Sequence, residues 1–219
     1  MERQAAEEGY VKLAVDRVSL NGNLIIPDGA RGLVAFAHGS GSSRHSPRNQ
    51  YVARVLRNAG LATLLFDLLT LDEEQEDLDT GRLRFDIGLL ARRLVSATDW
   101  LKNSETTRHL KPGYFGASTG AAAALVAAAE RPEAVSAVVS RGGRPDLAAP
   151  VLDRVKAPTL LIVGGDDYPV VDMNRRALAL LKVEKKLVIV PGATHLFEEP
   201  GTLEKVAELA GDWFSSHLK

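Results

Sequence analysis

The sequence predicts an α/β protein built on a mostly parallel sheet of about eight strands, with helices on both faces. Two observations indicate this class. From about residue 32 onward, short apolar runs alternate with longer segments of helical periodicity, as repeated strand–helix–strand units require. The apolar runs are also continuous, which is typical of strands that are covered on both faces.

The composition is that of one globular domain, which we expect to span residues 1–219. A formal net charge of −1 gives no general attraction to nucleic acid or to anionic membranes, so we expect neither as a partner. The lack of cysteine excludes disulfides, thiolate metal sites and a cysteine nucleophile. No segment resembles a secretory signal or a membrane span, which favours a cytoplasmic location. We expect a monomer or a homodimer.

The strands are expected in this order. A hairpin opens the chain, with strands over residues 11–20 and 23–27 and a tight turn at Asn21-Gly22, because this dipeptide tolerates positive φ. The apolar runs that follow are expected to be the strands of the main sheet, at residues 33–37, 62–66, 113–115, 135–140, 159–163 and 187–190.

Three helices are indicated between and after these strands. The alanine-rich stretch 121–129 has little polar character on any side, which predicts a buried helix packed closely on the sheet. Two amphipathic helices are indicated by apolar residues at helical spacing, namely Ile87, Leu90, Leu94, Ala97 and Leu101, then Leu203, Val206, Ala210, Trp213 and Phe214. The acidic segment 71–86 interrupts the alternation, and we interpret it as a solvated loop or, alternatively, as a mobile flap.

The pentapeptide Gly116-Ala117-Ser118-Thr119-Gly120 matches G-x-S-x-G, the turn that presents a nucleophilic serine between a strand and a helix. A short expected strand precedes it and the alanine-rich helix follows directly, so the context is the one that this turn requires. The helix N-terminus also places free N–H groups beside the serine. We therefore predict that Ser118 is a nucleophile; a serine that only caps the helix is the alternative.

A serine hydroxyl becomes a good nucleophile only when a base removes its proton. His195 is the candidate base, because it lies in the loop after the last expected strand, and doubly wound sheets place their sites on such loops. The other histidines are His38, His45, His109 and His217, and none of them follows the serine on a loop at a strand end. The third residue must orient the imidazole. Asp166 and Asp167 both follow the strand at 159–163, and the residues alone leave the choice between them open.

With these motifs in place, the chain resembles the small dienelactone hydrolase-related members of the α/β-hydrolase superfamily over nearly its whole length. The resemblance implies that fold and no cofactor or metal. The chain departs from many relatives in that no insertion before the acid loop is large enough for a lid domain, so we expect none. The superfamily pattern of Gly, two residues, Asp, two residues, Val matches Gly164, Asp167 and Val170, so it favours Asp167 as the acid. It also implies an oxyanion hole formed by the backbone N–H groups of Ser40 and Thr119.

The function expected from these features is hydrolysis of small, accessible carboxylic esters through an acyl-enzyme on Ser118, without a cofactor. Acyl transfer or thioester cleavage by the same residues is an alternative, and so is a hydrolase-fold accessory module without useful turnover. Nucleotide binding by the Gly-rich loop 38–44 is disfavoured because the loop lacks the Walker ending and the third spaced glycine.

Several arginines follow expected strands and so belong at the same edge of the sheet. Arg44, Arg48 and Arg144 are expected to pair with Asp67, Asp146 or the acidic segment. Arg141 is subject to the same interpretation, but it is also the candidate for binding a carboxylate or phosphate of the substrate.

Overall fold

The computed structural model describes residues 7–15 and 17–219, and within them eight strands form one sheet in the order β1-β2-β4-β3-β5-β6-β7-β8. The β1–β2 and β2–β4 pairs are antiparallel, and every other pair in this sheet is parallel. The strands are β1 Glu7–Val15, β2 Val18–Ile26, β3 Gly32–Ala37, β4 Ala62–Phe66, β5 Lys111–Ala117, β6 Ala137–Arg141, β7 Thr159–Gly164 and β8 Lys185–Val190. The mostly parallel eight-stranded sheet of the prediction is therefore confirmed.

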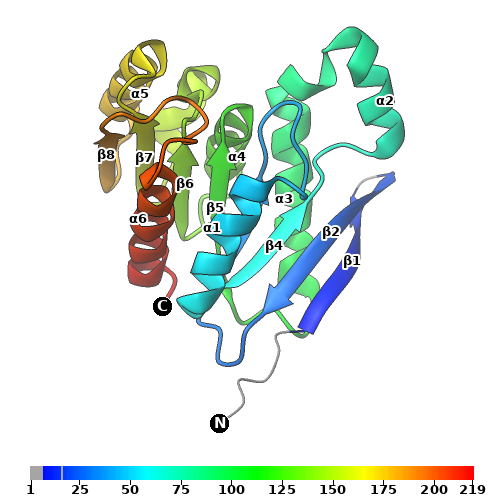
Figure 1. Ribbon diagram of the computed structural model, residues 1–219. Coiled ribbons are helices and arrows are strands. Elements are labelled where there is room, and N and C mark those ends of the chain that lie inside the picture. The colour runs from blue at the N-terminus through cyan, green and yellow to red at the C-terminus, as the bar shows by residue number, and fades with distance from the viewer. Residues whose placement is uncertain (1–6, 16) are drawn as a thin grey trace.

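Helices cover both faces of the sheet (Figure 1). One face carries α1 and α6, which contact each other, and the other carries α3, α4 and α5. The helices are α1 Pro47–Asn58, α2 Leu71–Thr80, α3 Ile87–Asn103, α4 Thr119–Glu130, α5 Tyr168–Leu180 and α6 Thr202–His217, with 3-10 helices η1 Leu83–Phe85 and η2 Pro145–Arg154. None of the helices in the described part of the chain is long and apolar enough to cross a bilayer.

Two apolar cores lie on the two faces of the sheet. The larger one packs α3 and α4 on the sheet, and every alanine of α4 from Ala121 to Ala124 is fully buried. The smaller one packs α1 and α6 on the opposite face, around Phe36, Phe115 and Phe214. Because side chains leave a strand alternately to the two faces, β3 is buried along its whole length, as its continuous apolar sequence predicts.

The hairpin turn predicted at Asn21-Gly22 is wrong. The two strands pair from Val15–Val18 outward, and Asn21 and Gly22 lie inside β2, opposite Lys12 and Val11. Glycine serves close packing here, since a Cβ on Gly22 would lie 2.9 Å from Leu13 Cδ1 and 3.2 Å from Phe66 Cβ. A dipeptide that suits a tight turn thus lies in a strand, where the glycine leaves room for its neighbours.

The interpretation of residues 71–86 as a loop is also wrong, because this segment forms α2 and η1. The helix begins with a capping box, in which the Thr70 hydroxyl accepts from the Glu73 N–H and the Glu73 carboxylate accepts from the Thr70 N–H. It ends at Gly81, whose φ of 63° is the left-handed conformation that favours glycine. Figure 1 shows α2 standing out beyond the carboxyl ends of the strands.

Candidate active site

A cleft of about 930 Å³ lies at the carboxyl ends of the parallel strands. The loops after β3 and β5, the end of β6, the loop after β8 and helix α2 all contribute to its lining. Ser40, Ser118, Arg141 and His195 are among the lining residues, so four of the predicted site residues meet in one cleft.

Ser118 sits on a strained turn between β5 and α4. Its φ of 50° and ψ of −121° are unusual for a residue with a side chain. The flanking glycines permit the turn to pack: a Cβ on Gly116 would lie 2.4 Å from Ala121 Cα, and one on Gly120 would lie 2.2 Å from the Ala37 carbonyl oxygen. This is the geometry that G-x-S-x-G predicts, with the serine at the N-terminus of a helix.

His195 and Asp167 are joined by a hydrogen bond of 2.6 Å between Nδ1 and Oδ2. Asp167 ends the loop after β7, and its side chain is largely buried, whereas Asp166 is exposed and its N–H donates to the Ala193 carbonyl. A Cβ on Gly142, which has a φ of 51°, would lie 3.1 Å from the His195 carbonyl oxygen. The loop after β6 thus packs closely on the histidine loop.

The loop after β3 is held by a buried histidine and by an ion pair. His38 Nε2 accepts from the Leu68 N–H at 3.0 Å, so the proton is on Nδ1, which lies 3.0 Å from the Gly39 carbonyl oxygen. Burial lowers the pKa of His38, although Gly39 and Asp67 act in the opposite direction, and the neutral ring suits this bonding. Asp67 pairs with Arg44 and also accepts from its backbone N–H.

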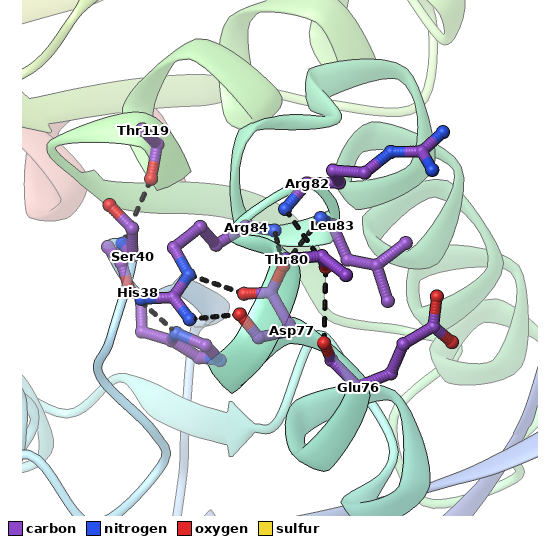
Figure 2. Close-up of polar contacts among 10 residues, drawn as sticks. His38, Ser40, Glu76, Asp77, Thr80, Arg82, Leu83, Arg84 and Thr119 are labelled. Carbon is purple, nitrogen blue, oxygen red and sulfur yellow. Dashed lines mark hydrogen bonds and ion pairs between the residues drawn. The ribbon is translucent and has the colours of Figure 1, made fainter.

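The two predicted oxyanion residues contact each other directly. The Ser40 N–H donates to Thr119 Oγ1 at 3.0 Å (Figure 2). Thr119 is the first residue of α4 and is almost entirely buried. The side chain of Thr119 therefore holds the loop that carries Ser40, a role that the sequence did not indicate.

Helix α2 forms one wall of the cleft through Leu71, Glu74 and Leu78. It is fastened by Asp77, whose carboxylate pairs with Arg84 and accepts from the Leu83 N–H at 2.6 Å (Figure 2). Burial would raise the pKa of Asp77, but the bonds from Arg84 and Leu83 outweigh it and lower that pKa. Leu71 and Leu78 are largely exposed, so they give this wall an apolar surface toward the cleft.

Three arginines line the cleft, and they differ in their partners. Arg84 is paired with Asp77, and Arg48 with Glu198, at 3.0 Å between Nη1 and Oε1. Arg141 is only 7% exposed, and within the described part of the chain no carboxylate oxygen lies within 4.0 Å of its guanidinium. The expectation of a pair with Asp67 or Asp146 is confirmed for Arg44 and Arg144. It is wrong for Arg48, because the loop after β8 brings Glu198 to its guanidinium instead.

Arg141 is held instead by weaker contacts. Its Nη1 lies 3.5 Å from the Leu196 carbonyl oxygen, and its Cζ lies 5.9 Å from the centre of the Phe197 ring. Its Nε is buried without a hydrogen-bond partner. Burial, with a contribution from Arg48, lowers the pKa of Arg141 to about 10, so the group stays charged at neutral pH.

The residues that sequence reasoning missed are Glu198 and the wall formed by α2. Glu198 lies three positions after His195, and no motif marks it, because its contact with Arg48 joins residues 150 positions apart. The signals for α2 were present in Thr70 and Glu73, which form a capping box, and in Gly81. In the portion of the chain that the structure describes, no three His, Asp or Glu side chains gather as a metal site would require.

The strand order and the strained serine turn after β5 place the protein in the class of α/β hydrolases. The chain belongs to the dienelactone hydrolase family, whose model matches residues 1–217. This membership and the α/β-hydrolase fold confirm the resemblance inferred from the motifs.

Among solved structures, a dienelactone hydrolase from Anabaena variabilis ATCC 29413 is 66% identical, with a TM-score of 0.97 over 98% of this chain and 99% of that one. Est1E from Butyrivibrio proteoclasticus shares the fold at 18% identity, with a TM-score of 0.80 over 95% of this chain and 98% of its own.

A curated protein from Mycobacterium tuberculosis (strain ATCC 25618 / H37Rv), provisionally named a phosphoribosyl transferase, is 59% identical over 208 residues. The match covers 95% of this chain and 46% of that protein, so the chain spans about half the length of this relative.

Proposed function

We propose that the protein is a serine hydrolase that cleaves carboxylic esters through an acyl-enzyme on Ser118. The observation that carries the proposal is the hydrogen bond of 2.6 Å between His195 and Asp167, in a cleft that Ser118 and His195 line together. A carboxylate that holds the imidazole through Nδ1 leaves Nε2 available as the base for the serine. Membership of a hydrolase family makes an ester-cleaving enzyme the expected class.

In the proposed reaction, His195 takes the Ser118 proton as Oγ attacks the ester carbonyl. The tetrahedral oxyanion that forms is stabilised by the backbone N–H groups of Ser40 and Thr119. Collapse expels the alcohol, which receives its proton from His195. A water molecule activated by the same histidine then hydrolyses the acyl-enzyme and frees Ser118.

The Ser40 N–H already donates to Thr119 Oγ1, and this contact bears on the oxyanion hole. We propose that the threonine hydroxyl keeps the loop close to α4 and that the oxyanion shares the Ser40 N–H when it forms. The bond then fixes the position of the Ser40 N–H before the substrate arrives, and a fixed donor is what electrostatic stabilisation requires.

We also propose that Arg141 contacts the substrate. Its backbone pairs with Ala117, the residue before the nucleophile, and Arg141 lines the same cleft as Ser118. We expect it to contact a carboxylate or phosphate of the substrate.

A fluorophosphonate probe tests the proposal, because it phosphonylates only an activated serine. We expect covalent labelling of the wild type, loss of labelling in Ser118→Ala, and loss of p-nitrophenyl acetate hydrolysis in the same variant. Ser42→Ala is the matched control, since Ser42 also lines the cleft and has no proposed role. Labelling that persists in Ser118→Ala would contradict the proposal, and so would a wild type that the probe does not label.

A further inference from the structure

The loop after β6, residues 142–144, contacts both the candidate nucleophile and the candidate base. The N–H of Arg144 donates to the Ser118 carbonyl oxygen at 3.1 Å. Gly142 packs on His195, since a Cβ added to this glycine would lie 3.1 Å from the His195 carbonyl oxygen and 3.6 Å from Nδ1 and Cε1 of the ring. A shift of this loop would therefore move the histidine relative to the serine.

The same loop is bonded to the helix that follows the candidate acid. Asn174 lies on α5, and its Nδ2 donates to the Gly143 carbonyl oxygen at 3.0 Å and to the Val170 carbonyl oxygen at 2.8 Å. Helix α5 begins directly after Asp167, whose carbonyl oxygen accepts from the Val170 N–H at 3.0 Å. One side-chain amide thus joins the first turn of α5, next to Asp167, to the loop 142–144.

The surroundings of Asn174 indicate that its hydrogen bonds, and not its packing, are what the site requires. The side chain is fully buried, and within the described part of the chain its Oδ1 has no hydrogen-bond partner. Burial of an amide oxygen without a partner costs free energy that a leucine, of the same branched shape, would avoid. A Cβ on Gly143 would overlap the Ser140 hydroxyl and lie 2.7 Å from Ala121 Cβ. Gly143 is thus packed against β6 and α4 and bonded to α5.

We propose that Asn174 is a positioning residue for catalysis at Ser118. By bonding Gly143 it fixes the loop after β6, and this loop fixes the place of the His195 imidazole relative to the serine. Asn174 itself does not line the cleft, so it acts only through the loop. A misplacement of about 1 Å in a reacting group can cost about 10²-fold in rate, so a buried bond outside the cleft is sufficient to control the reaction. The inference rests on the proposed ester hydrolysis.

Asn174→Leu tests the proposal, because it removes both donated bonds and keeps the branched shape. We expect kcat/KM for p-nitrophenyl acetate to fall by about tenfold or more, because the imidazole is no longer held in place beside the serine. The rate constant for fluorophosphonate labelling of Ser118 should fall in the same proportion. Asn174→Ala removes the same bonds without adding bulk and is the second variant if the leucine prevents folding. Wild-type values of both quantities in a folded variant would overturn the proposal.

Thr159→Val is the matched control for lost stability. It also removes a buried side-chain hydrogen bond, from Thr159 Oγ1 to the Ala157 carbonyl oxygen, but at the amino end of β7, opposite the end that reaches the cleft. Urea unfolding measures the stability of both variants, and both are assayed at a temperature at which they are folded. We expect Thr159→Val to keep kcat/KM within about threefold of wild type. An equal loss of kcat/KM in Thr159→Val and Asn174→Leu would contradict a positioning role.

A double-mutant cycle with Asp167→Asn separates action through the histidine from a general effect. Asp167→Asn favours the wrong tautomer of the imidazole, so the exact place of the ring no longer matters. In that background, Asn174→Leu should change the labelling rate constant by less than about threefold, although it costs about tenfold or more in the wild-type background. The same loss in both backgrounds would mean that Asn174 acts independently of His195, and it would refute the proposal.

Labelling of the wild type separates failure of this inference from failure of the proposed function. A wild type that is labelled at Ser118, together with an Asn174→Leu variant that is labelled equally fast, refutes only the positioning role. A wild type that the fluorophosphonate does not label refutes the proposed ester hydrolysis and, with it, this inference.

Discussion

Thr119 follows the candidate nucleophile directly, and its hydroxyl is the acceptor for the backbone N–H of Ser40. Removal of the hydroxyl leaves this N–H without a partner and frees the loop that we propose for the oxyanion hole. Thr119→Val keeps the volume of the side chain and should lower kcat/KM for p-nitrophenyl acetate by about tenfold, while Thr119→Ser should stay within about threefold of wild type. A loss in Thr119→Ser that equals or exceeds the loss in Thr119→Val would contradict this role of the hydroxyl.

The two neighbouring aspartates offer a second comparison at the residue scale. Asp167 bonds His195 at 2.6 Å, whereas Asp166 is exposed. Asp167→Asn would favour the wrong tautomer of the imidazole, and we expect kcat to fall by about 10³- to 10⁴-fold. Asp166→Asn is the matched control and should stay within a few fold of wild type in the same p-nitrophenyl acetate assay. A larger loss in the control would assign the acid to Asp166.

At the scale of elements, helix α2 depends on one carboxylate. Asp77 pairs with Arg84 and accepts from the Leu83 N–H, which joins the end of α2 to η1. The folded pKa of Asp77 is lowered, so its contribution to stability is fully present above the ordinary pKa of 3.8 and is lost as the pH falls through the lowered folded value.

Asp77→Asn should therefore lower the free energy of unfolding by about 2 kcal/mol at pH 7, and the difference from wild type should shrink once the pH falls below about 4. Urea unfolding at a series of pH values measures both quantities. Asp79→Asn is the control, because Asp79 is exposed on the same helix, and its effect should be under about 0.5 kcal/mol. A difference between wild type and Asp77→Asn that does not depend on pH would contradict the assignment.

For the whole molecule, stability depends on the contact of helices with both faces of the sheet. Phe214 of α6 is fully buried against β5, where a Cβ on Gly113 would lie 2.8 Å from the Phe214 ring. Phe214→Ala should lower the free energy of unfolding by about 3 to 5 kcal/mol, because it removes apolar contact and leaves a cavity. Leu180→Ala is the control at a partly exposed site, and urea unfolding of both variants measures the difference. Equal effects would mean that the α6 face contributes little.

The sequence alone predicted most of the fold, because continuous apolar runs and helical periodicity are patterns of residues that are close together in the sequence. The six apolar runs from residue 33 onward match β3 to β8, and the three expected helices match α3, α4 and α6. The two errors, at residues 21–22 and 71–86, also came from local sequence patterns. Asn21-Gly22 suited a turn but lies in β2, where Gly22 packs closely against Leu13 and Phe66. The acidic residues of α2 suited a loop, but the cap at Thr70 and the bonds of Asp77 to Arg84 and Leu83 stabilise a helix.

The sequence by itself determined the fold class, the family and the strand-end positions of Ser118, Asp167 and His195. These features depend on consecutive residues, such as the strand-to-helix motif, and on the order in which the loops follow one another along the chain. Only the tertiary structure decided which aspartate contacts His195, which arginine lacks a carboxylate, and that Thr119 Oγ1 holds Ser40. The physical reason is the same in each case. A hydrogen bond or an ion pair depends on distances between residues that are far apart in sequence, such as Arg48 and Glu198, and only the folded sheet brings them together.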